Sequence, residues 1–479
     1  MKKMFTKLFS AALLMGLTVI GFSAKAQSTS LAGGAQVAKT ASVTTDDTKA
    51  DEKAKAKEKA EAKADEKMAA KVAADPDTAW KPQRRVWGYT FGDFYYDAHS
   101  PAITVAQGKE NNYYQVPTYR NAFQFRRLYL GYDYEITKKF KAEVLLATEP
   151  TANVNAASGT SIQSSDNLVD GKMAFWIKNF NIRVRDLWNG TDFVIGELST
   201  PGFALNEPGT NAPTSLSEAT WGYRSIERTI TDFHKNNSYD VGAALQGTFD
   251  PATKNFGYVL MVSNNSTASL LSAANANSGF YKIFYGDLWG KFANNHLYAD
   301  LYYHTARSAA ATSAVGGQSN SMYKVFAAYL SKPFNLGVEA YTQTFENGVT
   351  DNGAVGATGA PKVVKNATVN GLSIWVRGAI NPTWNYFAKY DSYNPYTDFT
   401  GTDSYSVNAG AAAYGAYDPY TKEHFATFGL DYNPTKNVHF MPNIWYIQYI
   451  DNASPSVTGY VPNNHTLVYR FTFFFTFGK

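Results

Sequence analysis

The segment "HTLVYRFTFFFTF", residues 465–477, alternates large apolar side chains with smaller or polar ones over most of its length. In an extended strand, successive side chains point to opposite faces. One face then carries Leu467, Tyr469, Phe471, Phe473, Phe475 and Phe477, and the other carries Val468, Arg470, Thr472, Phe474 and Thr476. A sheet facing water would not expose the first face, whereas a strand facing lipid requires it. The segment therefore predicts a strand of a transmembrane β-barrel.

The composition of the chain agrees with this prediction. Aromatic residues make up 15% of the chain, with 33 Tyr and 31 Phe, yet the mean hydropathy is −0.32. Beyond residue 26 no run of 18 apolar residues occurs, which excludes a helical membrane protein. A chain rich in aromatics but mixed in polarity is typical of a barrel with an apolar outer face and a polar lumen.

Residues 1–26 have the pattern of a secretory signal peptide. Lys2, Lys3 and Lys7 precede an apolar stretch from Leu8 to Phe22, and "AKA" at 24–26 supplies small residues for cleavage. The alternative is a membrane anchor, for which the apolar stretch is short. Cleavage would remove four lysines and take the formal net charge from +4 to about 0. The basic balance therefore gives no support for nucleic-acid binding, and the chain has no cysteine for a lipid anchor or a disulfide.

Two segments are expected between the signal and the barrel. Residues 27–45 are small and polar and predict a disordered leader. Residues 46–78 consist largely of Ala, Lys, Glu and Asp, which predicts a solvated periplasmic α-helix ending near Pro76. This helix is interpreted as a spacer. The alternative is a coiled coil that trimerises or contacts the cell wall, but only Met68 and Val72 offer apolar seam positions.

Residues 84–479 predict about sixteen antiparallel strands. Short turns rich in Asn, Pro, Gly and Lys alternate strictly with eight long polar loops. These loops are predicted at 98–122, 149–172, 200–238, 265–279, 308–321, 346–368, 394–423 and 451–464. An even strand count places both termini in the periplasm. Sixteen strands leave an aqueous channel, whereas fourteen would favour a narrower, plugged channel for hydrophobic substrates.

Charged residues that alternate with apolar ones are expected to face the lumen, because a charge facing lipid costs about 2–4 kcal/mol at mid-membrane. This rule turns Arg127, Arg183, Arg185, Arg377 and Lys389 inward. The favoured interpretation is a solvated wall of mixed charge. The alternative interpretation is that Arg127, Arg183 and Arg185 form a ladder that attracts anions. The carboxylates nearby argue against this alternative.

The third loop, residues 200–238, is the longest and is expected to fold inward and narrow the channel. Its segment "SIERTITDF", residues 225–233, predicts a short helical turn that brings Arg224, Glu227 and Arg228 together. These three residues either set the electric field at the constriction or fasten the loop to the wall by ion pairs. Both interpretations remain open from the sequence.

Three segments resemble the phosphate-selective porin O/P-like family and related general porins of Gram-negative outer membranes. They are "NAFQFRRLYLGYDYEI" (121–136), "WGYRSIERTITDF…YDVGAALQGTF" (221–249) and "NVHFMPNIWYIQY" (437–449). The resemblance covers most of residues 84–479 and implies a homotrimer of 16-stranded barrels with an inward third loop. It carries over the charged cluster of Arg224, Glu227 and Arg228. With 12 arginines in the whole chain, it does not carry over a phosphate preference.

The sequence therefore predicts an outer-membrane porin for passive diffusion of small hydrophilic solutes and ions. The alternative is a structural or adhesive barrel whose loops bind surface partners. A barrel enzyme is disfavoured because the seven His are scattered and no nucleophile–base grouping occurs. A gated importer is disfavoured because residues 46–78 are too small for a plug. No catalytic residue, metal site or cofactor is expected, and outer-membrane lipid and lipopolysaccharide are the expected surroundings.

Overall fold

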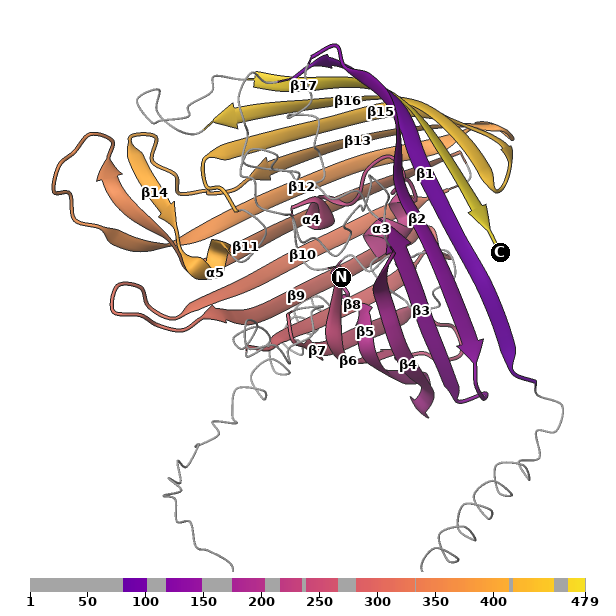
Figure 1. Cartoon of the computed structure of the whole chain (residues 1–479). Coiled ribbons are helices and arrows are strands. Elements are labelled where there is room, and N and C mark those ends of the chain that lie inside the picture. Colours follow the sequence, from indigo (N-terminus) through magenta and orange to yellow (C-terminus); the bar gives the residue numbers. More distant parts are fainter. Residues whose placement is uncertain are drawn as a thin grey trace, which may run out of the picture. The chain divides into compact units, whose positions relative to one another are not determined.

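The computed structural model describes residues 81–100, 118–148, 175–202, 216–234, 238–265, 281–331, 333–412, 417–451 and 464–478. The predicted signal, leader and charged helix lie outside the described residues. The described residues belong to one compact unit that starts at Ala79. Figure 1 shows its long strands side by side in one curved sheet.

Sixteen of the described strands form a closed antiparallel barrel, as the alternating pattern predicts. Fifteen pairings join the sixteen strands in chain order, with β13 pairing directly with β15, and β1 pairs with β17 to close the ring. The strand bounds are β1 Gln83–His99, β2 Asn121–Glu135, β3 Phe140–Thr148, β4 Trp176–Trp188, β5 Thr191–Ser199, β6 Tyr239–Thr248, β7 Phe256–Ser263, β8 Ile283–Phe292, β9 Leu297–Ala309, β10 Gln318–Leu330, β11 Phe334–Ala354, β12 Val363–Asn381, β13 Trp384–Asn394, β14 Asp403–Val407, β15 Thr421–Thr435, β16 Val438–Asp451 and β17 Asn464–Phe477. β14 is the seventeenth strand and lies outside the ring.

Three long loops are shorter than the sequence predicts. Strands β11 and β12 continue into the range predicted as the loop 346–368, and β10 begins within the predicted loop 308–321. The loop predicted at 394–423 contains β14 and the short helix α5, Ala409–Ala412. β14 pairs with the far end of β11, from Val349 to Ala354. Figure 1 shows β14 beside the projecting ends of β11 and β12. Val349 in this hairpin is fully buried.

The two faces of the strands differ in polarity as the alternation predicts. On β17, Tyr469 and Phe471 are exposed, whereas Arg470 and Thr472 are buried. On β4, Phe180 is 59% exposed and its neighbour Asn181 is 4% exposed. The apolar face therefore points outward and the charged face inward, which is the polarity of a barrel set in lipid.

One strand departs from strict alternation. Phe91 of β1 pairs with Arg127 of β2, but the next residue of β1 pairs with Phe125, so Arg126 is the extra residue of a β-bulge. As a result Arg126 and Arg127 both lie on the inner face. Strict alternation predicts Arg127 inward but would place Arg126 outward.

Large rings cover glycines on neighbouring strands. Gly131 on β2 pairs with Trp87 on β1, and a Cβ at Gly131 would lie 2.1 Å from Trp87 Cε2. Gly337 on β11 and Trp375 on β12 repeat this arrangement, with a separation of 2.2 Å. Only glycine leaves room for the ring to lie flat against the sheet, so these pairs fix the register of the strands.

We expect the substitution Gly131→Val to destabilise the barrel by about 1–3 kcal/mol, because overpacking forces the Trp87 ring out of its position. The matched control is Gly286→Val, since the nearest atom to a Cβ at Gly286 is 4.0 Å away. The measurement is the urea-unfolding midpoint of the detergent-refolded protein. Equal midpoints for the two variants would contradict a specific role for the Trp87–Gly131 contact.

Two short helices lie in the predicted third loop. They are α3, Leu216–Trp221, and α4, Ile230–Phe233, and both contact strands of the barrel. Among the described helices, none is long and apolar enough to cross a membrane.

Candidate functional site

The charged residues that the sequence turns inward lie on the inner face of the barrel. Arg127, Arg183 and Lys389 are buried, and Arg185 and Arg377 are partly buried. In the third loop, Glu227 and Arg228 are buried and Arg224 is partly buried. The eight predicted site residues therefore share the interior of the barrel, but the structure distributes them over three separate groups.

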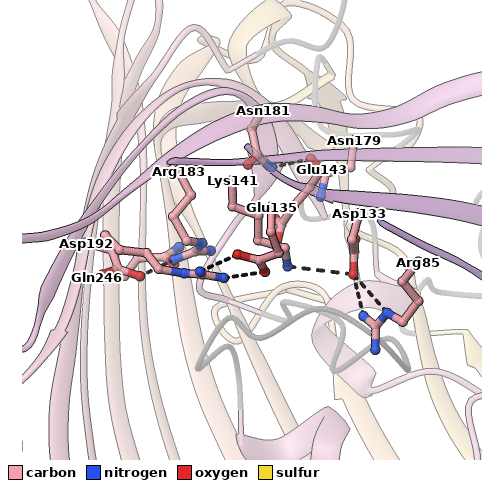
Figure 2. Close-up of polar contacts among 11 residues, drawn as sticks. Arg85, Asp133, Glu135, Lys141, Glu143, Asn179, Asn181, Arg183, Asp192 and Gln246 are labelled. Carbon is pink, nitrogen blue, oxygen red and sulfur yellow. Dashed lines mark hydrogen bonds and ion pairs between the residues drawn. The ribbon is translucent and has the colours of Figure 1, made fainter. Parts of the chain in front are cut away.

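The first group is a network of ion pairs and hydrogen bonds on strands β1 to β6 (Figure 2). Arg183 Nη1 lies 3.1 Å from Asp192 Oδ2 and donates a hydrogen bond of 3.0 Å to Gln246 Oε1. Arg185 forms a salt bridge with Glu135. Lys141 Nζ lies 2.6 Å from Glu143 Oε1 and 3.7 Å from Asp133 Oδ2.

This network gives the inner wall a mixed charge. Arg183 and Arg185 each face a carboxylate, and Arg127 Nη1 donates a hydrogen bond of 3.2 Å to the hydroxyl of Tyr129. A ladder of arginines needs charges that are not neutralised by neighbouring carboxylates. The arrangement of Arg183 and Arg185 therefore favours the mixed-charge wall over the anion-attracting ladder.

The second group is the described part of the third loop, residues 216–234, which we call the loop segment. Its backbone and side chains bind inward-facing residues of several strands. Tyr223 donates a hydrogen bond of 3.1 Å to Asp431 Oδ2 on β15, and Thr231 donates one of 3.0 Å to Glu339 Oε1 on β11. Arg126 Nη1 donates to the carbonyl oxygen of Ser225 at 2.7 Å. The loop segment is thus attached to opposite parts of the strand order, β2 and β11–β15.

Apolar contacts attach the loop segment as well. Trp221 is fully buried and its ring centroid lies 5.9 Å from that of Trp375 and 6.2 Å from that of Phe387. Ile226 and Ile230 are also fully buried. Because a buried aromatic side chain removes a large apolar area from water, Trp221 is the main apolar anchor of the segment.

Asp232 organises the charged residues within the loop segment. Its carboxylate accepts hydrogen bonds from Arg224 Nη1 at 2.9 Å, Arg228 Nη1 at 3.0 Å and Ser238 Oγ at 2.8 Å. Burial raises the pKa of Asp232, but Arg228 and Arg224 outweigh burial and hold the pKa below its ordinary value. The carboxylate therefore stays ionised between the two arginines.

The structure places the three charged residues predicted for this cluster in two different settings. Arg224 and Arg228 meet at Asp232, inside the loop segment, and these two ion pairs join parts of the segment to each other. Glu227 stands apart: its Oε1 accepts the backbone N–H of Arg228 at 2.7 Å. Burial raises the pKa of Glu227, and the charge of Lys389 opposes this effect. Lys389 donates to the carbonyl oxygen of Arg228 and thereby links β13 to the segment.

Arg377 belongs to the third group. It lies on β12 beside the loop segment, with its guanidinium carbon 6.0 Å from the centroid of the Tyr223 ring. Its Nη1 would lie 3.3 Å from a Cβ at Gly222, whose φ of +70° is a conformation that suits glycine. Among the described residues, Arg377 has no hydrogen bond or salt bridge.

The sequence analysis does not predict two further polar contacts of the inner wall, Arg470 with Asp93 and His439 with Asp431. Arg470 on β17 and Asp93 on β1 are both fully buried, with Arg470 Nη2 2.7 Å from Asp93 Oδ1. Arg470 Nη1 also donates to the carbonyl oxygen of Ile226 at 3.3 Å. His439 Nδ1 lies 2.9 Å from Asp431 Oδ1. Alternation predicts that Arg470 points inward, but the partners come from strands far apart in the sequence.

Among the described residues, no group of three or more His, Asp or Glu side chains could hold a metal ion. No protein-family model matches the chain. No curated protein matches it either.

Solved structures of outer-membrane channels are similar to the chain at low identity. They include the anion-selective porin of Comamonas acidovorans, with 11% identity, a TM-score of 0.48, and coverage of 83% of this chain and 100% of that one. The outer-membrane channel DcaP of Acinetobacter baumannii has 10% identity, a TM-score of 0.48, and coverages of 83% and 97%. OprB of Pseudomonas putida has 12% identity, a TM-score of 0.47, and coverages of 82% and 94%. The fold assignment rests on the strand pairing of this chain itself.

Proposed function

We propose that this protein is an outer-membrane porin through which small hydrophilic solutes and ions diffuse passively. The observation that carries the proposal is a closed barrel of sixteen described strands with an apolar outer face and a charged inner face. Barrels of sixteen to eighteen strands leave an aqueous channel, whereas eight-stranded ones are filled by side chains. No covalent chemistry is required of such a channel.

The loop segment is proposed to narrow the channel. Its contacts with β2, β11 and β15 support a position across the lumen, and its charges then lie along the path of a solute. Under this proposal Arg127, Arg183, Arg185 and Lys389 line the channel, while Arg224, Glu227 and Arg228 set the field at the constriction. Arg377 lies where the loop segment meets the wall.

The proposed setting is the outer membrane of a Gram-negative cell, surrounded by lipid and lipopolysaccharide. The short connections, such as Pro382–Thr383 between β12 and β13, would face the periplasm together with both termini. A homotrimer and a cell-wall contact through residues 46–78 are further parts of the proposal. The resemblance of residues 121–136, 221–249 and 437–449 to general porins supports the trimer, and cross-linking of the detergent-extracted protein tests it.

Single-channel recording in a planar lipid bilayer tests the porin function. We expect refolded protein to insert with stepwise increases in conductance and a weak preference between K⁺ and Cl⁻, because positive and negative side chains are paired on the inner wall. Far-UV circular dichroism of the same sample controls for folding. Folded barrels that insert without any current would overturn the porin proposal.

A silent barrel would support the second candidate function, a structural or adhesive barrel whose loops bind surface partners. One observation favours this candidate: several inner-wall side chains, among them Lys141, Lys324 and Arg470, are at most 4% exposed. Such deep burial indicates a tightly packed interior. A structural barrel would need no open path through it.

The charge of the constriction is tested by ion selectivity. We expect the double substitution of Arg224 and Arg228 by Ala to shift permeability toward cations, because it removes two positive charges and leaves the Asp232 carboxylate. The shift is measured as the reversal potential in a KCl gradient. Lys254→Gln, in an exposed turn, is the matched control. Unchanged selectivity in the folded double variant would mean that the two arginines serve only to hold the segment together.

A further inference from the structure

A polar cavity of about 300 Å³ lies between the loop segment and the wall of the barrel. Gly222 and Tyr223 form its side toward the loop segment, and residues of β11, β12, β13, β15 and β16 form the other sides. The lining consists of Gly222, Tyr223, Asn335, Arg377, Gly378, Ala379, Asn385, Asp431, Asn433 and His439. This volume is at the lower end of the range of about 300–1,000 Å³ for small-molecule pockets.

The two charged residues of this cavity, Asp431 and Arg377, differ in how many partners they have. Asp431 is fully engaged: its oxygens accept hydrogen bonds from Tyr223 at 3.1 Å and from Asn385 at 3.5 Å, and face His439 Nδ1 at 2.9 Å. Arg377, in contrast, has few partners. Among the described residues it lies over the Tyr223 ring and has no carboxylate within salt-bridge distance, although the Asp431 carboxylate in the same cavity acts on its charge from further away.

Arg377 thus carries a positive charge with no salt bridge or hydrogen bond among the described residues, beside a loop segment that hydrogen bonds and apolar contacts attach to the wall. Its planar guanidinium presents paired N–H groups that match the two oxygens of a carboxylate. The Tyr223 ring and the Gly222 backbone limit the directions from which a ligand can reach it. The remaining polar lining comes from the amides of Asn335, Asn385 and Asn433, which suit hydroxyl and amide groups of a ligand.

We infer that this cavity is a binding site for a small organic monocarboxylate, with Arg377 holding the carboxylate. A singly charged ligand is favoured because Asp431 lines the same cavity and repels a second negative charge. An acid of about three to six carbons with hydroxyl groups matches the volume and the asparagine amides. This inference names a substrate class for the proposed porin. It rests on the porin function only for the route by which the acid reaches the cavity.

Binding to the refolded protein in detergent tests the site without any need for conductance. Titration calorimetry with lactate is expected to show one saturable site, and Arg377→Gln is expected to weaken lactate binding at least tenfold, or about 1.4 kcal/mol. Arg377→Lys should be intermediate, because it keeps the charge and loses the paired geometry. The matched control is Arg85→Gln, on the inner wall at β1, which should bind lactate like the original protein.

Two ligand comparisons need no variant. Lactamide has nearly the shape of lactate but no charge, and it should bind at least tenfold more weakly. Inorganic phosphate at pH 7.5 should also bind more weakly than lactate, because of Asp431. Equal binding of lactate and lactamide, or of Arg377→Gln and the original protein, would overturn the site. Tighter binding of phosphate would overturn its assignment to monocarboxylates.

The two proposals fail independently. A barrel that binds lactate but carries no current contradicts the porin function and leaves the site intact. A conducting channel that does not bind lactate contradicts the site alone.

Discussion

Replacing Asp232 with Ala is expected to release the loop segment and give a channel with larger and noisier current. Asp232 accepts hydrogen bonds from Arg224, Arg228 and Ser238, so the substitution removes one acceptor from three donors. Removing one partner of a buried ion pair costs about 3–5 kcal/mol, because the remaining charge stays buried. Since the strand pairing of the wall does not involve Asp232, the barrel itself should remain folded.

Two measurements check this expectation. Single-channel recording should show a higher mean conductance and more current noise than the original protein. Amide hydrogen exchange in residues 223–232 should accelerate by roughly a hundredfold, the factor that corresponds to about 3 kcal/mol. Asp398→Ala, at an exposed loop position, removes the same charge and should change neither quantity. If the Asp232→Ala channel showed no added current noise and its amides exchanged as slowly as in the original protein, other contacts would suffice to hold the loop segment.

The same cluster predicts how the channel responds to acid. The pKa of Asp232 in the folded protein lies below its ordinary value of 3.8, because Arg228 and Arg224 outweigh the effect of burial. A lowered carboxyl pKa contributes stability that is fully present above the ordinary value and is lost as pH falls through the folded one. The loop segment should therefore stay attached at pH 4 and loosen only in stronger acid. Current noise recorded from pH 7 down to pH 3 checks this, and a rise in noise already near pH 5 would contradict it.

Much of the barrel could be predicted because its signals are local. Alternation with a period of two shows which face of a strand meets lipid, and the last strand, residues 465–477, shows it over most of its length. Turn residues placed the seven short connections between strands. The alternation of short and long connections then gave sixteen strands, which the structure confirms.

The structure departs from the local sequence pattern where a non-local interaction overrides it. The extra residue Arg126 reverses the alternation within β2, and nothing in the local pattern marks that bulge. The β11–β12 hairpin extends further than predicted because β14, Asp403–Val407, pairs with it from a distant part of the chain. The ends of this hairpin are polar and rich in Asn and Gly, a composition that predicts a loop unless the partner strand is known.

In the candidate site, too, the local contacts could be predicted from the sequence and the non-local contacts could not. The prediction that Arg224 and Arg228 meet follows from their spacing of four residues, and Asp232 continues that spacing. The pairing of Asp93 with Arg470 joins residues 377 positions apart, so it depends on closure of the barrel. Alternation places Arg377 inward, but its lack of a salt bridge among the described residues is a property of the assembled wall. A partner, or the lack of one, therefore becomes visible only in the folded barrel.

Trp221→Ala is expected to detach the loop segment through loss of apolar packing rather than loss of charge. Trp221 is fully buried against Trp375, Phe387 and Tyr223, and its Nε1 donates to the carbonyl oxygen of Glu227 at 2.8 Å. Truncating a buried tryptophan to alanine costs about 3–5 kcal/mol. Most of this cost should fall on the loop segment, because the strands that contact Trp221 keep their own pairing.

The expected readout is again a higher mean conductance with an unchanged β-sheet signal in circular dichroism. Trp221→Phe should restore most of the original behaviour, because it retains much of the ring area but not the hydrogen bond to Glu227. Trp188→Ala removes an exposed tryptophan at the end of β4 and should leave the conductance as it was. An unaltered conductance in Trp221→Ala would remove Trp221 as an anchor.

Combining Trp221→Ala with Asp232→Ala tests whether the apolar and charged contacts hold one element. If each substitution alone releases the whole loop segment, the double variant should conduct no more than the more open single variant. Additive increases would instead indicate two parts that move separately, one around Trp221 and one around Asp232. The first result is expected, because Trp221 bonds to Glu227 and Arg228 bonds to Asp232 within one short run of chain.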